Sequence, residues 1–225
     1  GIDDLRIATR VWKETEGEPE VVRRAKVLAA KVREMPIHIG AEELLVGWRG
    51  NVSMGEGRLG EWGHLFGMQM EMTVDQYAPF LSDEDARELR EELIPYWKAR
   101  DYVIPIPPQM REAGITELWS RPQLPHWTPN WEKLLEKGLL GIKKDAEERL
   151  ARLDLTKLED VEKIPFLEGV IIGLEAAAEI GGRYAARARE LAATEANPRR
   201  KAELLKIAEV CDRVPAYPPR TFYEA

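Results

Sequence analysis

This 225-residue chain has three histidines, His38, His64 and His126, and a single cysteine, Cys211, which are the first residues to consider for acid–base or nucleophilic chemistry. His126 stands out because it lies in the stretch LPHWTPNW, between two prolines and beside two tryptophans. Prolines restrict the backbone and indoles shield an imidazole from water, which suits a hydrogen bond to a substrate hydroxyl. The same surroundings equally suit an imidazole that bonds only a backbone carbonyl. We therefore name His126 as the candidate substrate-binding residue and keep both roles open.

The position of Cys211 predicts a structural role. It continues an apolar helical stripe formed by Leu204, Ile207 and Ala208, which is typical of a small core residue. One cysteine allows no CxxC motif, and the three histidines form neither an HxxxH nor an HExxH pair. We therefore predict no catalytic residue, no metal ligand and no cofactor bound by this chain.

Motifs for nucleotide binding or hydrolysis are missing from the sequence. The stretch GEGRLG has the GxGxxG spacing but follows no convincing strand–turn–helix pattern, so it predicts no dinucleotide site. Neither a P-loop nor a GxSxG elbow occurs. Adjacent acidic residues such as Glu91 and Glu92 point about 100° apart on a helix, which predicts solvated charges rather than paired catalytic carboxylates.

The composition narrows the class of protein. With 44% hydrophobic and 32% charged residues, the chain is typical of a globular protein with a substantial core. A formal net charge of −7, with basic residues scattered among acidic ones, argues against nucleic-acid binding. No apolar run approaches the ~20 residues that a membrane helix needs, and the single cysteine fits a reducing compartment. We expect no membrane partner and a cytoplasmic location.

Apolar periodicity in the first half predicts two helices. One occupies residues 19–35 and ends before Pro36; the other begins at the cap Ser82 and is kinked or ended by Pro95. Between them, residues 47–67 are crowded with glycine and predict a long irregular segment. The buried stripes are Val22, Ala25, Ala29 and Val32 in the first helix, and Ala86, Leu89, Leu93 and Trp97 in the second.

Helical patterns return after the segment that holds His126. We predict Thr128 as a cap with Pro129 at the first helical position, Leu134 and Leu135 pointing inward, and an interruption at the glycines 138 and 141. A long helix follows Pro165, and a last one starts at Asn197 and Pro198. The long stripe comprises Phe166, Val170, Leu174, Ala177, Gly181, Tyr184, Ala188 and Leu191. The fold class is thus mainly α, with a few short strands in 39–48 or 101–106, and we find no domain boundary.

Three stretches of the sequence carry a family resemblance. LSDEDARELREELIPYWKAR ends in a proline–aromatic–tryptophan–lysine turn, and PHWTPNWEKLLEKGLLGI leads from a histidine into a helix that ends in Gly-x-x-Gly-Ile. The segment from RYAARARELAA to VPAYPPRTFYEA is the most specific. In order and together, these stretches resemble the glycyl radical enzymes, the superfamily of pyruvate formate-lyase and the diol dehydratases, from about residue 20 to residue 225.

The resemblance implies an α/β barrel enzyme of which residues 1–225 form the N-terminal helical part. In that family a radical S-adenosylmethionine activase installs a glycyl radical, which passes to a cysteine that attacks the substrate. Neither the Gly-Cys-x-Glu loop nor the Arg-Val-x-Gly loop occurs in this chain. The resemblance therefore implies three partners: the remaining C-terminal part of the enzyme, the activating enzyme and a second copy in a homodimer. In dehydratases of the family, the histidine matched by His126 bonds a substrate hydroxyl.

Two hypotheses of function follow. The first is the N-terminal portion of a glycyl radical lyase, inactive alone, with dehydration slightly favoured because of His126. Decarboxylation of an arylacetate is the next choice, since Trp119, Trp127 and Trp131 offer an aromatic lining; cleavage of a 2-oxo acid stays open. The second hypothesis is a non-catalytic helical binding or assembly module. The first also predicts that the face from Leu174 to Leu191 is uncovered when the barrel is absent.

Overall fold

The computed structural model describes residues 2–47, 81–100, 109, 112–113 and 129–225. Every regular element in these ranges is a helix and none is a strand, which confirms the predicted mainly α fold. The chain divides into two compact units, Gly1–Thr9 with Gly50–Thr128 and Arg10–Arg49 with Pro129–Ala225, at boundaries that the sequence does not mark. Across the described residues, no helix has the length and apolar character needed to cross a membrane.

The first unit contains a helix in three consecutive pieces: α4 (Asp83–Glu88), a π-helical turn (Leu89–Leu93) and α5 (Ile94–Lys98). The Ser82 hydroxyl accepts a hydrogen bond from the Asp85 amide at 3.1 Å, which confirms the predicted cap. The predicted stripe is also confirmed, since all four of its members are buried: Ala86, Leu89, Leu93 and Trp97.

Pro95 does not end this helix, but it makes the helical hydrogen bonding irregular. Proline has no N–H to donate, and its ring crowds the carbonyl four residues earlier. The chain widens into the π-helical turn immediately before it, where the Ile94 amide donates to the Leu89 carbonyl. Trp97 therefore still reaches the core, and its indole Nε1 donates to the Thr9 hydroxyl of α1 (Ile2–Glu14) at 2.9 Å.

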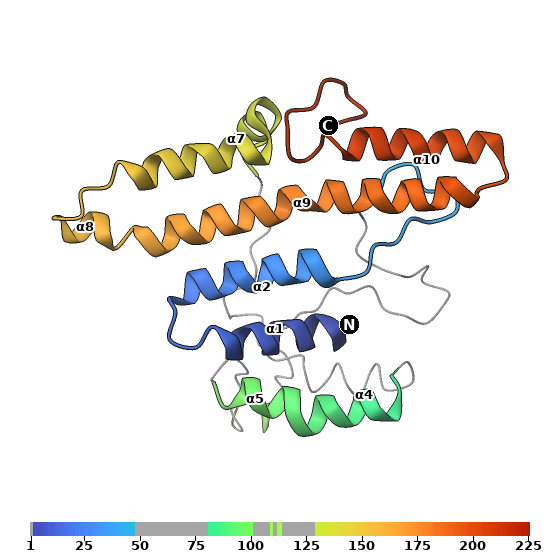
Figure 1. Cartoon of the computed structure of the whole chain (residues 1–225). Helices are drawn as coiled ribbons and strands as arrows, with labels where there is room; N and C mark the ends of the chain where they lie inside the picture. Colours follow the sequence, from blue (N-terminus) through green and yellow to red (C-terminus); the bar gives the residue numbers. More distant parts are fainter. Residues whose placement is uncertain (1, 48–80, 101–108, 110–111, 114–128) are drawn as a thin grey trace. The chain divides into compact units, whose positions relative to one another are not determined.

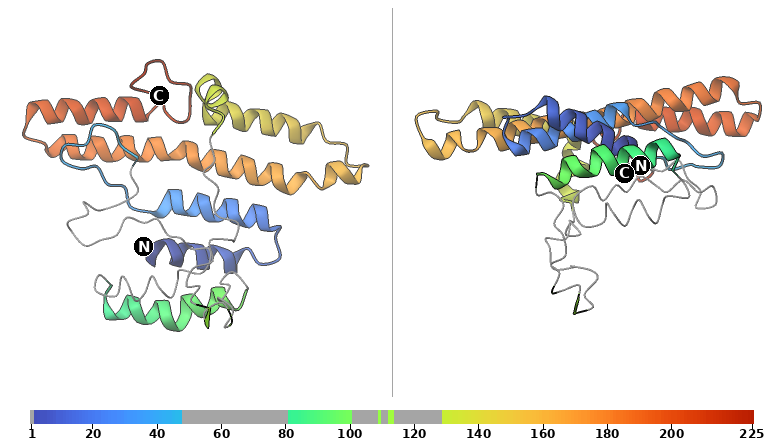
Figure 2. Two further views of the ribbon diagram at one scale, coloured as in Figure 1. Left: turned by 180° about the vertical axis from the view of Figure 1, so that it is seen from behind. Right: turned by 90° about the horizontal axis from the view of Figure 1, so that it is seen from below.

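The second unit is built along α9 (Ile164–Thr194). Helix α2 (Glu20–Glu34) lies along one side of α9, while α7 (Trp131–Ala151) and α10 (Pro198–Cys211) follow one another along the other side (Figure 1). Helices α7 and α10 run antiparallel to α9, and the short helix α8 (Leu158–Val161) joins α7 to α9 (Figure 1). Seen from below, α2, α7, α9 and α10 form a single layer (Figure 2).

Small residues let α2 approach α9 closely. A Cβ at Gly169 would lie 3.1 Å from the Val21 carbonyl oxygen, and Ala176 is fully buried against Ala29. Arg183 of α9 then donates to the carbonyls of Val32 and Met35, the latter at 2.6 Å. Its guanidinium thus satisfies carbonyls that the end of α2 leaves without a helical partner. The predicted α2 stripe is confirmed because its four members are buried: Val22, Ala25, Ala29 and Val32.

The packing of α9 corrects two predictions. The face expected to be uncovered is buried at Tyr184 and Ala188, because α10 and the segment around Ile39 close over it. Phe166, expected on the inward stripe, is instead exposed, and its neighbour Leu167 is buried. Phe166 and Tyr184 are 18 residues apart, about five helical turns, so they lie on the same face of α9. Phe166 is exposed because α10 and the segment around Ile39, which cover Tyr184, lie at the other end of the helix.

One expected strand is not formed. Residues 39–47 make turns and bends, and no strand partner occupies their backbone groups. The carbonyls of Gly40 and Glu43 instead accept hydrogen bonds from the Arg200 side chain. The other expected strand, residues 101–106, lies outside the described residues.

Candidate functional site

The candidate residue His126 lies outside the described residues, as do His64, Trp119 and Trp127. The structure therefore does not test its role, and its assignment as a substrate contact stays a prediction. Of the three histidines only His38 is described, and its side chain is exposed. The first described element after His126 in the chain is helix α7, and its geometry is described next.

Helix α7 begins two residues later than the sequence predicted. Asn130 is the cap, and its side-chain oxygen accepts from the Lys133 amide at 3.0 Å. Pro129 therefore precedes the helix, and Trp131 is its first residue. An asparagine that can accept this bond competes with a threonine two residues earlier, so the prediction of Thr128 was wrong. The prediction for Leu135 was also wrong, since its side chain is exposed.

The predicted interruption of α7 is confirmed at Gly138, whereas the prediction for Gly141 was wrong because this residue continues the helix. Gly138 has φ 64° and ψ 174°, a conformation outside the helical region. The next two amides, those of Leu139 and Leu140, donate to the carbonyls of Pro215 and Ala216 at 3.1 and 3.0 Å instead of to carbonyls of the helix. Residues 212–225, which we call the tail, thus cap the second part of α7 through their backbone.

The tail also packs closely against α9. A Cβ placed on Gly181 would lie 2.4 Å from the carbonyl oxygens of both Cys211 and Val214. A Cβ on Gly138 would lie 2.6 Å from the Tyr217 carbonyl carbon. These two glycines therefore leave room for the tail between α7 and α10, where Figure 1 draws it at the C-terminus.

A buried carboxylate fixes the end of the tail. Glu224 accepts from the Arg220 amide at 2.6 Å and from the Arg220 guanidinium at 2.7 Å, with Arg213 3.9 Å away. These hydrogen bonds from Arg220 lower the pKa of Glu224 to about 2. The carboxylate is therefore ionised across the physiological range and acts as a structural anion rather than as a proton donor.

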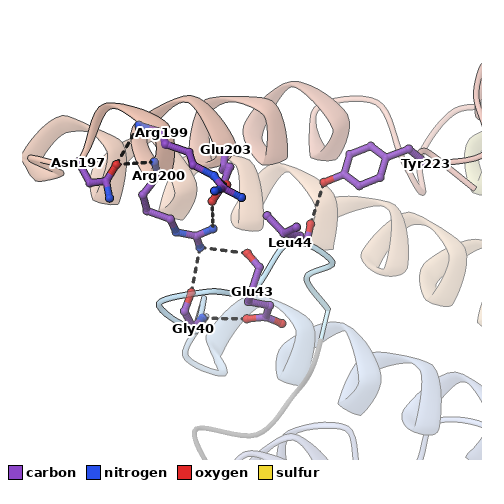
Figure 3. A network of polar contacts seen from close by, with 8 residues as sticks. All are labelled: Gly40, Glu43, Leu44, Asn197, Arg199, Arg200, Glu203 and Tyr223. Atoms are coloured by element: carbon purple, nitrogen blue, oxygen red, sulfur yellow. Dashed lines mark hydrogen bonds and ion pairs between the residues drawn. The ribbon is translucent and has the colours of Figure 1, made fainter.

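A second arginine holds the segment after α2 against α10 (Figure 3). Arg200 is buried, and its guanidinium donates to the carbonyls of Gly40 and Glu43 at 2.9 and 3.0 Å and to Glu203. The Asn197 side chain accepts from the Arg200 amide, which confirms the predicted start of α10 (Figure 3). Nothing in the spacing of the sequence pointed to Arg200, because its partners are carbonyls 157–160 residues away.

Cys211 has the environment predicted for it. It lies half buried against the cluster of Leu204, Ile207 and Ala208. Burial, with a smaller effect from Asp212, raises the pKa of its thiol to about 11. A thiol that stays protonated does not fit a nucleophile, and its packing against these apolar side chains fits the predicted structural role. Among the described residues there is also no cluster of histidine, cysteine or carboxylate groups able to hold a metal ion.

Within the described residues, the arrangement is thus that of a helical scaffold, with arginines and glycines placed to hold backbone segments. A family model described as "Pyruvate formate lyase-like" matches residues 2–225. The chain therefore belongs to the pyruvate formate lyase-like family of glycyl radical enzymes, which confirms the resemblance seen in the sequence.

Individual proteins agree with this assignment. The chain is 33% identical to isethionate sulfite-lyase of Oleidesulfovibrio alaskensis, over 100% of this chain and 29% of that protein. It is 34% identical to trans-4-hydroxy-L-proline dehydratase of Clostridioides difficile, over 100% and 30% respectively. The crystal structure of a glycyl radical enzyme from Archaeoglobus fulgidus superposes with a TM-score of 0.77 at 31% identity, again over 100% of this chain and 30% of that one.

The chain thus spans about 30% of the length of the relatives that it matches, and it corresponds to their N-terminal portion.

Proposed function

We propose that this chain supplies the N-terminal helical portion of a glycyl radical lyase that eliminates a leaving group from its substrate. The observation that carries the proposal is the match of the whole chain to two proteins named a sulfite-lyase and a dehydratase. Both names describe the release of a small group, sulfite or water. Elimination is therefore favoured over cleavage of a 2-oxo acid or decarboxylation, and dehydration becomes one of two eliminations to test.

The chain's own part in this function is positioning. The tail holds the second part of α7 through the amides of Leu139 and Leu140, and the chain reaches α7 directly from the segment that contains His126. A donor of a hydrogen bond to substrate works only if its backbone is fixed to within a fraction of an ångström. We propose that His126 provides that hydrogen bond.

The radical chemistry is proposed to come from elsewhere in the enzyme. The glycyl radical would be installed by a radical S-adenosylmethionine activase. The cysteine that attacks the substrate would be one other than Cys211, which packs against the apolar cluster of α10. On this proposal the chain alone has no activity. Its partners are the rest of the enzyme, the activase and a second copy in a homodimer, acting in the cytoplasm.

The test uses the complete protein with its activase under anaerobic conditions. Electron paramagnetic resonance reports the glycyl radical, and product analysis follows a hydroxyalkanesulfonate, a hydroxylated amino acid, a 1,2-diol and an arylacetate. We expect a radical signal and an elimination product from one of the first three substrates. Carbon dioxide from the arylacetate would replace elimination by decarboxylation. A protein with neither radical nor product would instead be a non-catalytic assembly module.

The role of His126 is tested in the same assay. We expect His126→Ala to lower turnover on the order of 100-fold with an unchanged radical yield, because an unpaired substrate hydroxyl costs a hydrogen bond in the transition state. His126→Gln keeps a donor and should recover part of the activity. Unchanged kinetics for His126→Ala would leave this residue with a structural role only.

A further inference from the structure

The end of the tail and the segment before residue 48 together expose apolar side chains. Phe222 is 100% exposed and Leu45 is 72% exposed, and their neighbours Tyr223 and Leu44 are exposed as well. The Tyr223 hydroxyl donates to the Leu44 carbonyl oxygen at 2.8 Å, which joins the two segments (Figure 3). We call these four residues, Leu44, Leu45, Phe222 and Tyr223, the tail surface.

The exposure of Phe222 is held by the structure around it and is not that of a frayed end. The amide of Glu224 donates to the carbonyl and the hydroxyl of Thr221 at 3.1 and 3.2 Å. The Glu224 carboxylate binds Arg220 on the other side of Phe222. A ring fixed between two such anchors stays in water unless another molecule covers it.

The other half of the tail surface is fixed in a comparable way. Leu44 and Leu45 follow directly after Glu43, whose carbonyl accepts from the buried Arg200. The Gly40 amide also donates to the Glu43 carboxylate at 2.8 Å, which tightens the same turn (Figure 3). Two separately anchored segments therefore present apolar groups at one place, the pattern expected of a preformed docking surface.

We propose that the remaining portion of the enzyme docks on the tail surface and that an apolar pocket of that portion binds the Phe222 ring. This inference rests on the proposed function, since it assumes an enzyme larger than the present chain. The relatives that match the whole of this chain are matched over only 29–30% of their own length. The unmatched remainder of such a polypeptide is therefore large enough to cover these exposed apolar side chains. A buried aromatic ring is the usual anchor of such an interface.

The test compares backbone hydrogen exchange in this chain alone and in the complete protein before activation. We expect peptides covering residues 40–46 and 216–225 to exchange about 10-fold more slowly, or slower still, in the complete protein. Phe222→Ser should abolish that protection, whereas Phe222→Leu should retain it because an apolar side chain still fills the pocket. Exchange needs neither radical nor substrate, so loss of turnover and loss of docking are separate results.

Three results would overturn the inference. One is equal exchange of the two peptides in both proteins. Another is protection that appears around α8, where Leu155, Leu158, Val161 and Phe166 are exposed, and leaves the tail surface unchanged. The third is a dimer of this chain alone, seen by sedimentation, that Phe222→Ser dissociates, because the occupant would then be a second copy.

Discussion

The two ends of α9 carry similar apolar residues and have opposite surroundings. At the C-terminal end Tyr184, Ala185 and Ala188 are buried under α10 and the segment around Ile39. At the N-terminal end Phe166 is 60% exposed. The difference lies in the connections: the three residues after α9 return α10 along the same helix, whereas α7 and α8 leave the outer side of Phe166 uncovered. Apolar periodicity therefore identifies a contact face without identifying its partner.

Close backbone approach marks the covered end. Gly181 and Gly138 both contact the tail, at distances where any side chain would overlap carbonyl groups. Contacts are looser at the glycines of the uncovered end: a Cβ on Gly169 would lie 3.1 Å from the Val21 carbonyl oxygen, and one on Gly173 would meet only a Leu28 methyl group at 3.8 Å. Stability should accordingly depend much more on substitutions near the tail than on substitutions around α8.

The largest effect is expected at Gly138. Gly138→Ala should lower the free energy of unfolding by about 4 kcal/mol, because a positive φ is unfavourable for alanine and its methyl would overlap the tail backbone. Urea denaturation measures the change. Gly17→Ala is the matched control, since Gly17 has φ 89° and nothing within 4 Å, and should cost only about 1 kcal/mol. An equal loss of unfolding free energy in the two variants would show that the tail backbone does not contact α7 closely at Gly138.

Two adjacent glycines of α9 give the next largest contrast. Gly181→Ala should destabilise the chain by about 2 kcal/mol, because overlap with two carbonyl oxygens outweighs the better helix propensity of alanine. Gly182→Ala should instead stabilise it by about 0.5–1 kcal/mol, since a Cβ there meets open space. The same urea titration compares the two variants. Stabilisation by both would contradict the close approach of the tail.

The tail should also make stability depend on pH. The pKa of Glu224 is lowered from its ordinary value of 4.5 to about 2 by Arg220, so the folded state prefers the carboxylate. Its contribution is complete above about pH 4.5 and is lost as the pH falls toward 2. The difference between the denaturation midpoints at pH 6 and pH 3 should therefore be smaller in Glu224→Gln than in the unmodified chain. An unchanged pH dependence would show that this carboxylate titrates normally.

The smallest effect is expected at the uncovered end. Phe166→Ser should change the free energy of unfolding by less than about 0.5 kcal/mol, because the ring is already in water. The next residue supplies the control: Leu167→Ala removes a buried side chain and should cost about 3 kcal/mol. A large loss from Phe166→Ser in this chain would mean that the two ends of α9 are not different.

The sequence predicted local features well where a few neighbouring residues decide them. Ser82 and Asn197 cap their helices as expected, and Gly138 interrupts α7. One error lies where two local solutions compete, since Asn130 replaced Thr128 as a cap. Another lies where a distant partner decides, since Phe166 is on the face of Tyr184 but is not covered. The candidate site was predicted only as His126, which lies outside the described residues, so its role stays a prediction.

By itself, then, the sequence determined the positions of α2, α4, α7, α9 and α10, most of their buried stripes and the core position of Cys211, because each depends on spacing within one segment. The family followed from several such segments in order, whereas α1 and α8 were not predicted. Only the tertiary structure decided that Arg200 and Arg183 bind carbonyls of distant segments and that the tail lies against Gly138 and Gly181. These contacts join residues that are far apart in the chain and use backbone groups, which every residue has. No pattern of side-chain types therefore marks them before the chain is folded.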